Sequence, residues 1–180
     1  MPKKKWVVLG FLALISPVLV FGAKSETSTQ NIQISADIFE LDAKTNLVVA
    51  SGNVVVTQKD MKILGRMAEF DQKKKVVKLT DHVTLTRGNV TLSCAEIVAY
   101  GQESRVEAMG GVQFQSEELH GRSEKALYDF YRQTIRLEGE PRAWKGTDEV
   151  SGRVILVDLK RNKMTTQGNA KMVLDLEQIR

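Results

Sequence analysis

The sequence has little of several residue types, and each shortage excludes a class of protein. Cys94 is the only cysteine among 180 residues, so no disulfide can form within the chain. A single cysteine in a chain of this kind is expected to be a small buried hydrophobic residue. Proline occurs three times, and beyond the first 17 residues only Pro141 interrupts the chain. No apolar period of 3.6 residues is sustained after the N-terminal segment, which argues against a helical protein.

An excess of positive charge is confined to the N-terminus. The formal net charge is +4, but Lys3, Lys4 and Lys5 precede any acidic residue. From Lys24 onward there are 23 basic and 22 acidic residues. Proteins that bind nucleic acid usually concentrate basic charge on one face, so a nearly neutral domain gives no reason to expect nucleic acid as a partner.

The N-terminal segment is typical of export. Three lysines are followed by an uncharged apolar run from Trp6 to Phe21, which is shorter than the roughly 20 residues that cross a bilayer and contains Pro17. We predict a signal peptide at residues 1–25 and an exported domain at residues 26–180. An uncleaved membrane anchor remains the alternative.

The chain repeats with a period of 29 residues. The anchor positions of the repeat are Gly52, Asp81, Gly110, Gly139 and Gly168. Apolar residues or proline occupy the second and fourth positions after each anchor, as in Val54 and Val56, Val83 and Leu85, Val112 and Phe114, Pro141 and Ala143, Ala170 and Met172. The same alternation precedes each anchor, as in Val48 and Ala50, Val77 and Leu79, Val106 and Ala108, Ile135 and Leu137, Met164 and Thr166. A period of two on both sides of glycine or aspartate predicts a half-buried strand with a bend at the anchor.

Each repeat also contains a second strand and a polar turn. The second strands are expected to begin near Ala36, Ala68, Ala95, Ala126 and Val154. Turn formers and charged residues occur at 42–46, 71–75, 101–104, 131–133 and 160–163, which is consistent with hairpins. The pattern predicts a stack of antiparallel β units, each pairing chiefly with its neighbours. A sandwich, a roll and an open jelly roll all satisfy it.

The sequence offers no catalytic or metal-binding arrangement. His82 and His120 are isolated from each other and from Cys94 in the sequence, without the spacing of metal ligands. No serine or cysteine nucleophile can be placed beside a histidine. We therefore predict no enzymatic activity, no metal and no cofactor. The charged runs at 73–75 and 160–163 are interpreted as solvated turns.

Two stretches resemble a known family. Residues 32–37 (IQISAD), Leu41-Asp42 and residues 50–58 (ASGNVVVTQ) resemble the opening of the LptA/OstA-like family of lipopolysaccharide-transport proteins. His120-Gly121-Arg122, residues 126–130 (ALYDF), residues 135–139 (IRLEG) and residues 150–153 (VSGR) are similar to the later repeats of that family in order and spacing.

The resemblance implies an all-β fold, an open antiparallel β-jelly roll built from the stacked repeats. Its interior holds lipid A acyl chains while sugar and phosphate groups face outward. It also implies a periplasmic protein that associates head to tail with itself and with LptC-like and LptD-like β-jelly-roll domains, linking the inner and outer membranes through these partners. Unpaired strands at the ends of a stacked sheet give a physical basis for such association.

The predicted lipid-binding residues come from two sources. The resemblance implies Ile32, Ile34, Phe114, Tyr128 and Phe130. Alternation of side chains adds Ile38, Val56 and Leu85. Two alternatives stay open: an LptC-like subunit anchored by residues 6–21, and a structural β-repeat module of the envelope that binds protein or glycan. The chemical variant of the lipid, the length of any oligomer and the identity of the partners are not determined by the sequence.

Overall fold

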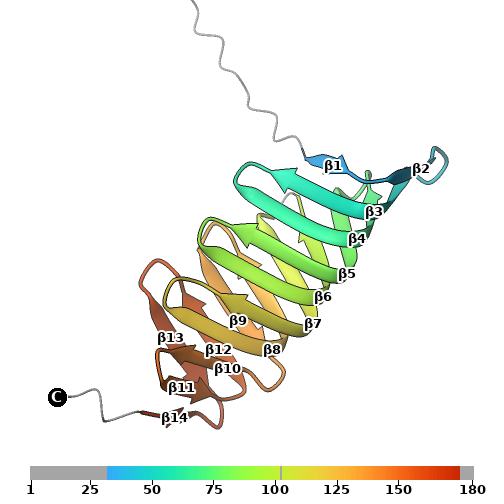
Figure 1. Cartoon of the computed structure of the whole chain (residues 1–180). Coiled ribbons are helices and arrows are strands. Elements are labelled where there is room, and N and C mark those ends of the chain that lie inside the picture. The colour runs from blue at the N-terminus through green and yellow to red at the C-terminus, as the bar shows by residue number, and fades with distance from the viewer. Residues whose placement is uncertain (1–31, 102, 175–180) are drawn as a thin grey trace, which may run out of the picture.

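A computed structural model describes residues 32–101 and 103–174 of the protein. Every regular element within these residues is a β-strand, and all strand pairings are antiparallel. The strands are β1 (Gln33–Ser35), β2 (Ile38–Asp42), β3 (Leu47–Gln58), β4 (Met61–Asp71), β5 (Val76–Arg87), β6 (Val90–Tyr100), β7 (Arg105–Gln115), β8 (Leu119–Asp129), β9 (Thr134–Glu138), β10 (Arg142–Lys145), β11 (Asp148–Ser151), β12 (Val154–Asp158), β13 (Lys163–Gln167) and β14 (Lys171–Val173). They form one sheet and stack along the molecule in nearly chain order (Figure 1). The predicted all-β architecture is confirmed.

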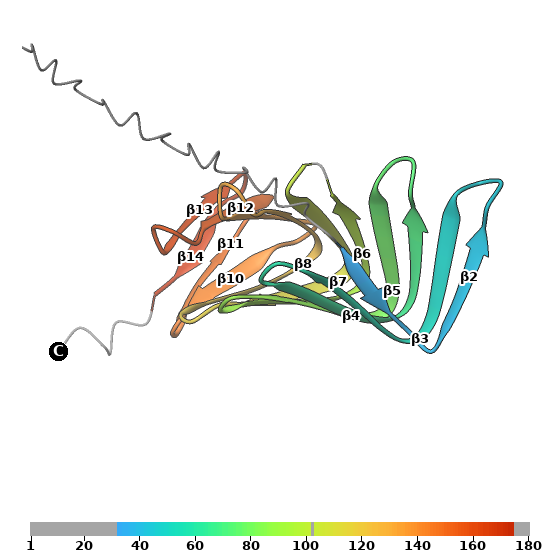
Figure 2. The ribbon, with the colours of Figure 1, turned by 90° about the horizontal axis from the view of Figure 1, so that it is seen from above.

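The predicted bends lie at the anchor positions of the repeat. The register of the sheet shifts between Ser51 and Val54 in β3, and equivalent shifts occur in β5 and β7. Gly52 and Gly110 have φ angles of 77° and 79°, a region that glycine enters without a steric penalty. Asp81 occupies the same region with φ 69°. Because the bends lie side by side in neighbouring strands, the sheet folds over onto itself (Figure 2).

The bends divide the sheet into two halves. The first half contains β2, β9, β12 and β13, and the second contains β1, β10, β11 and β14. Strands β3 to β8 have 11 or 12 residues each and contribute a segment to both halves. At Gly139 and Gly168 the bend ends the strand, so the last repeats are made of short separate strands.

The second strand of the central repeats begins earlier than the sequence pattern predicts. Ala68, Ala95 and Ala126 lie inside β4, β6 and β8, five to seven residues after each strand begins. The prediction missed an additional turn in each of these repeats, between β3 and β4, β5 and β6, and β7 and β8. Strand β12 does begin at the predicted Val154.

The side chains that point between the two halves form one apolar core. Ile63, Leu79, Leu85, Leu92 and Ile97 are fully buried there. Burial of each such side chain contributes roughly 1.5–3 kcal/mol. The residues at the second and fourth positions after each of the first four anchors are buried, which confirms the predicted alternation there. These positions lie in the second half of the sheet. In the last repeat, Ala170 and Met172 are exposed, because no further strand covers them within residues 32–101 and 103–174.

Turns from successive repeats stack on one another along the edge of the first half. In each of four turns, the first residue donates its backbone N–H to the carbonyl of the residue that ends the preceding turn: Gln72 to Asn46, Gly101 to Lys75, Phe130 to Ser104, and Leu159 to Gln133. The accepting residues all have φ between 50° and 61°. Aspartate side chains that accept backbone N–H groups of their own turns recur with the 29-residue period, at Asp42, Asp71, Asp129 and Asp158.

Candidate functional site

The two halves of the sheet meet along a seam that lies opposite the bends. We call the stacked turns that join β2 to β3, β4 to β5, β6 to β7, β8 to β9 and β12 to β13 the first lip. The second lip consists of the turns that join β3 to β4, β5 to β6, β7 to β8 and β10 to β11. Side chains connect the lips: Arg87 Nη1 donates to the Phe130 carbonyl at 3.4 Å, and Asn162 donates to the Glu118 carboxylate. In the part of the chain that the structure describes, the seam is therefore held by side-chain contacts and not by a backbone ladder.

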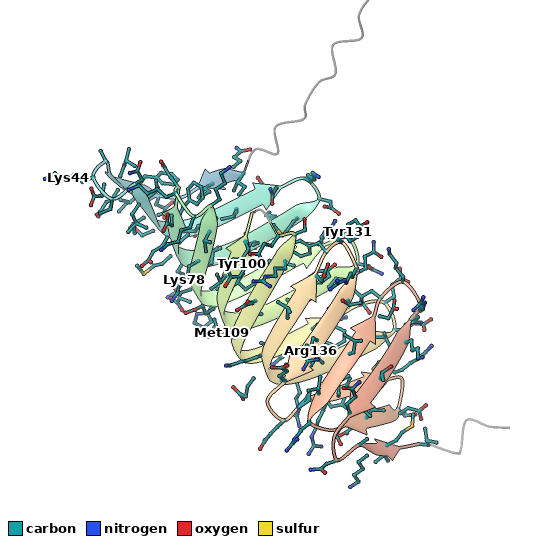
Figure 3. The ribbon with its side chains drawn as sticks, turned by 180° about the vertical axis from the view of Figure 1, so that it is seen from behind. Lys44, Lys78, Tyr100, Met109, Tyr131 and Arg136 are labelled. Atoms are coloured by element: carbon teal, nitrogen blue, oxygen red, sulfur yellow. The ribbon has the colours of Figure 1, made fainter. Side chains whose placement is uncertain are left out.

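Most of the predicted lipid-binding residues lie in the interior behind this seam. Val56, Leu85, Phe114 and Tyr128 are buried in the core. Ile32, Ile34 and Phe130 are half-buried and pack against it. On the outer face of the first half, by contrast, lie residues such as Lys78, Met109 and Arg136 (Figure 3). Seven of the eight predicted residues thus share one apolar interior, and their contact with lipid stays a prediction.

Ile38 is the exception, and the structure places it on the outer face. Its register partner is Ser51, whereas the neighbouring Phe39 faces Ala50, which is buried in the core. The bend at Asp37 explains the difference, because an added residue inverts the alternation that Ile34 begins. The same inversion separates Ile63 from Ala68 in β4. The prediction that Ile38 points into the interior was wrong, and Phe39 takes that orientation.

A small pocket opens from the interior into the seam. Its volume is about 80 Å³, and its apolar wall includes Ile32, Val56, Met61, Val77 and Phe130. Pockets that enclose a drug-sized ligand measure about 300–1,000 Å³. An acyl chain can therefore enter only if the lips move apart.

Arg87 lies at the mouth of this pocket on the second lip. Its guanidinium group is 4.8 Å from the centre of the Phe130 ring, and its Nε lies 3.1 Å from both carboxylate oxygens of Asp60. The Phe130 ring meets Tyr128 edge to face, with 4.7 Å between ring centres. Burial raises the pKa of the Tyr128 hydroxyl, and the nearby Arg87 opposes that increase. Tyr128 is therefore neutral at physiological pH.

Arg105 lines the same pocket from the first lip. Its guanidinium group lies 4.8 Å from the centre of the Tyr100 ring, and its Nε lies 2.7 Å from Glu103 Oε2. Arg87 and Arg105 could not be identified from the sequence, because a lone arginine among 26 basic residues has no distinguishing pattern. One signal was available: Tyr100 occupies the position at which the other turns of the first lip have aspartate.

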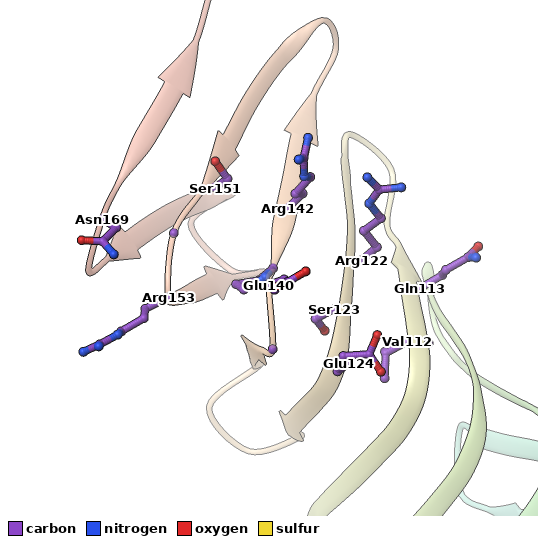
Figure 4. Close-up of a pocket in the computed structure, with 14 residues that line it drawn as sticks. Val112, Gln113, Arg122, Ser123, Glu124, Glu140, Arg142, Ser151, Arg153 and Asn169 are labelled. Atoms are coloured by element: carbon purple, nitrogen blue, oxygen red, sulfur yellow. The ribbon is translucent and has the colours of Figure 1, made fainter.

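A larger hollow lies on the outside of the bends, and its chemistry is different. It measures about 640 Å³ and is lined mainly by polar residues, among them Arg122, Arg142, Glu124 and Glu140 (Figure 4). Arg142 is paired with Glu149 at 2.9 Å, and Arg153 points away from Arg122 and Arg142. The hollow lacks the apolar wall of the seam pocket, so it does not suit an acyl chain.

The single cysteine lies in the core. Cys94 Sγ donates to the Glu96 carbonyl at 3.2 Å, and burial raises the pKa of the thiol to about 11. Within residues 32–101 and 103–174, no three His, Cys, Asp or Glu side chains are placed to hold a metal ion. The same residues include no helix that is long and apolar enough to span a membrane.

Apolar side chains are exposed at both ends of the stacked sheet. Ile38, Phe39 and Leu41 on β2 are exposed at one end, and Met172 and Val173 on β14 are exposed at the other. Neither β2 nor β14 has a second neighbouring strand among the described residues. Both ends therefore offer backbone groups and apolar surface to a further strand.

The chain is similar in sequence to known proteins. The sequence model of the family described as LptA/(LptD N-terminal domain) LPS transport protein matches residues 33–69 and 62–163. The lipopolysaccharide export system protein LptA of Haemophilus influenzae is 25% identical over 141 residues, which cover 69% of this chain and 82% of that protein. The crystal structure of LptH from Pseudomonas aeruginosa, the LptA homologous periplasmic component of the lipopolysaccharide transport device, covers 81% of this chain and 96% of its own, with 19% identity and a TM-score of 0.36. Since the family model spans most of the described residues, the chain belongs to the LptA/(LptD N-terminal domain) family of LPS transport proteins.

Proposed function

We propose that this protein carries lipopolysaccharide across the periplasm, with the lipid A acyl chains held between the two halves of the sheet. The role is transport and not catalysis. The observation that carries the proposal is an apolar core that runs through the repeats and reaches the surface at the seam. Membership of an LPS transport family supports the choice of cargo.

The interior suits a lipid because it is apolar and continuous. Buried side chains from β3 to β12 contribute to a single core, in which Ser123 is among the few polar groups. Removal of apolar surface from water contributes about 25 cal/mol per Å². An acyl chain in the interior would supply this contact in place of the contacts that the two halves now make with each other. Weak contacts distributed along the interior allow the lipid to be shielded without a tight site that would prevent its release.

Entry of the lipid requires the seam to open. The contacts between the lips include the Arg87 to Phe130 and Asn162 to Glu118 hydrogen bonds. Both come from side chains at or near solvent, where each such bond contributes about 0.5–1.5 kcal/mol. On the opposite side, continuous strands β3 to β8 connect the halves through the bends. We expect the halves to separate at the seam and to pivot at the bends.

In this proposal, the two ends of the sheet link the protein to its partners at the inner and outer membranes. An edge strand can pair with a strand of another protein, and exposed apolar side chains beside it add contact area. We propose that β2 and β14 pair with further copies of this chain, or with LptC-like and LptD-like β-jelly-roll domains, in a head-to-tail arrangement. The exported form consists of residues 26–180 in this proposal. The signal peptide predicted at residues 1–25 lies outside the described residues.

Photo-crosslinking inside and outside the core tests the cargo. A photoreactive amino acid at Phe114 or Tyr128 is expected to label lipopolysaccharide, because both side chains point into the interior. Gln113 provides the matched control, since it neighbours Phe114 on the same strand but is exposed. Labelling at Gln113 equal to that at Phe114 contradicts transport through the interior.

The two alternatives give different results. A structural envelope module that binds protein or glycan yields crosslinks to those molecules and none to lipopolysaccharide at Phe114. An LptC-like subunit labels lipopolysaccharide but retains residues 6–21, so the mass of the protein isolated from the envelope distinguishes it from the exported carrier.

A further inference from the structure

Two arginines bound the seam pocket, one from each lip. Arg87 ends β5 on the second lip, and Arg105 begins β7 on the first lip. Arg87 contacts Phe130. Arg105 is the register partner of Asp129, the residue that precedes Phe130 in the sequence. Both arginines therefore line one pocket, whose wall includes Ile32, Val56 and Met61.

Each guanidinium group is positioned by an aromatic ring and paired with a replaceable carboxylate. The rings are Phe130 for Arg87 and Tyr100 for Arg105, both at 4.8 Å. The carboxylate partners, Asp60 and Glu103, have side chains that are 59% and 51% exposed. Ion pairs with so much solvent around them contribute little to stability, so an anion that brings further contacts can displace them. The rings keep the arginines in place during the exchange.

The repeat pattern adds positive character at this point. The first lip has aspartate before its turn in four repeats, but the third repeat has Tyr100. An aspartate at position 100 would place a second carboxylate beside Arg105, in addition to Glu103. Asp129, which is opposite Arg105, is engaged with the backbone and side chain of Arg132 in its own turn. The departure from the repeat therefore leaves Glu103 as the carboxylate that an anion has to displace from Arg105.

We propose that Arg87 and Arg105 bind a phosphate group carried by an amphiphile whose acyl chain occupies the pocket between them. The proposal rests on the proposed function, and it assigns the site at which the anionic part of the cargo is recognised. A guanidinium group can donate two parallel hydrogen bonds to the oxygens of one phosphate group. A phosphate can therefore replace the exposed carboxylate partner without loss of hydrogen bonds. Since Arg87 also joins the two lips, transfer of its hydrogen bond from Phe130 to the phosphate releases the seam where the chain enters.

The test combines two ligands with two substitutions. The dissociation constants of a bisphosphorylated lipid A and of the same lipid after phosphatase treatment are measured with the full-length chain and with R87Q, R105Q and the double variant. The double variant is expected to bind the phosphorylated lipid about 10-fold more weakly or worse, which corresponds to about 1.4 kcal/mol. Its affinity for the dephosphorylated lipid is expected to change less than about twofold, or about 0.4 kcal/mol.

Two controls separate recognition from other effects. Arg136→Gln removes an arginine from the outer face, and it should leave the affinities for both lipids unchanged. Inorganic phosphate alone should show no arginine-dependent binding at concentrations that saturate the lipid, since it has no acyl chain for the pocket. Circular dichroism verifies that each variant keeps its β-sheet.

Distinct outcomes count against the site and against the function. Equal losses of affinity for the two lipids, or no loss for either, overturn the phosphate site while transport stands. Arginine-dependent binding of inorganic phosphate, without a contribution of phosphate to lipid affinity, assigns the arginines to free phosphate and overturns the proposal too. If the unaltered chain binds neither lipid, the proposed function fails, and the phosphate site fails with it.

Discussion

The centre and the ends of the molecule have the same sequence pattern but different burial. Leu85 and Met172 occupy the same position of the repeat, four residues after the anchor. Leu85 is 0% exposed, whereas Met172 is 58% exposed. Leu85 lies on β5 between β4 and β6, while Met172 lies on β14, which among the described strands pairs with β11 alone. The repeat therefore determines which way a side chain points, and the neighbouring strands determine whether it is buried.

Truncation of these two side chains should show the largest difference. Leu85→Ala is expected to lower the free energy of unfolding by about 2–5 kcal/mol, because it removes buried contacts and leaves a cavity. Met172→Ala should change it by less than about 0.5 kcal/mol, as is usual at the surface. Urea unfolding followed by circular dichroism measures both. Similar losses for the two variants would show that β14 is covered in solution.

The bends offer a second comparison, between a central glycine and one in an open turn. Gly110 and Gly88 both have positive φ, but a Cβ at Gly110 would lie 2.8 Å from the Cβ of Ala95, whereas at Gly88 nothing lies within 4 Å. Gly88→Ala should cost about 1–2 kcal/mol from backbone strain alone. Gly110→Ala adds the steric conflict and should cost about 2–4 kcal/mol. Thermal unfolding of the two variants tests the order, and an equal cost would mean that the bend relaxes freely.

The burial of Cys94 in the centre of the molecule should make the free energy of unfolding depend on pH. Burial raises the pKa of Cys94 to about 11, so the folded chain holds this proton between pH 9 and 11 while the unfolded chain loses it. Stability should therefore fall by about 1–2 kcal/mol as pH rises through this range. Cys94→Ala, which cannot ionise, should lack this part of the loss. Parallel slopes for the two chains would indicate that solvent reaches the thiol.

A smaller effect on folding is expected at the N-terminal end. Phe39→Asp should lower the free energy of unfolding by about 1 kcal/mol, since the side chain faces Ala50 but is already about half exposed. In the proposed head-to-tail arrangement it should nevertheless weaken self-association, which sedimentation velocity detects over a concentration series. Gln33→Asp, on the neighbouring β1, is the control for charge alone. Unchanged association of the Phe39 variant would exclude β2 from the contact.

Much of the architecture could be predicted from the sequence because the anchors have a fixed spacing. Gly52, Asp81 and Gly110 lie at bends, and the alternation around them gives the inward face of β3, β5 and β7. The strands that pair with them were harder, since their bends have no glycine in common: Gly65, Cys94 and Ser123 occupy equivalent positions. Without that marker, neither the start of β4 nor the outward orientation of Ile38 could be predicted.

The site could be predicted only in its apolar part. Alternation identifies Val56 and Leu85 as interior residues, because every second residue of a strand shares a face. Arg87 and Arg105 come together only through folding, since their strands lie on opposite lips of the seam. Their separation in the sequence follows no spacing rule that distinguishes them from other arginines at strand ends.

The fixed period of the repeat determines the steps in which the length of the stacked sheet can change. Each unit of 29 residues adds two strands to each half of the sheet, and neighbouring strands lie about 4.8 Å apart. Duplication or deletion of one whole unit therefore changes the length of the molecule in steps of about 10 Å, with every hydrogen-bonding partner replaced by an equivalent one. A protein of this design can be fitted to compartments of different width by gain or loss of units, while insertions of any other size disturb the ladder.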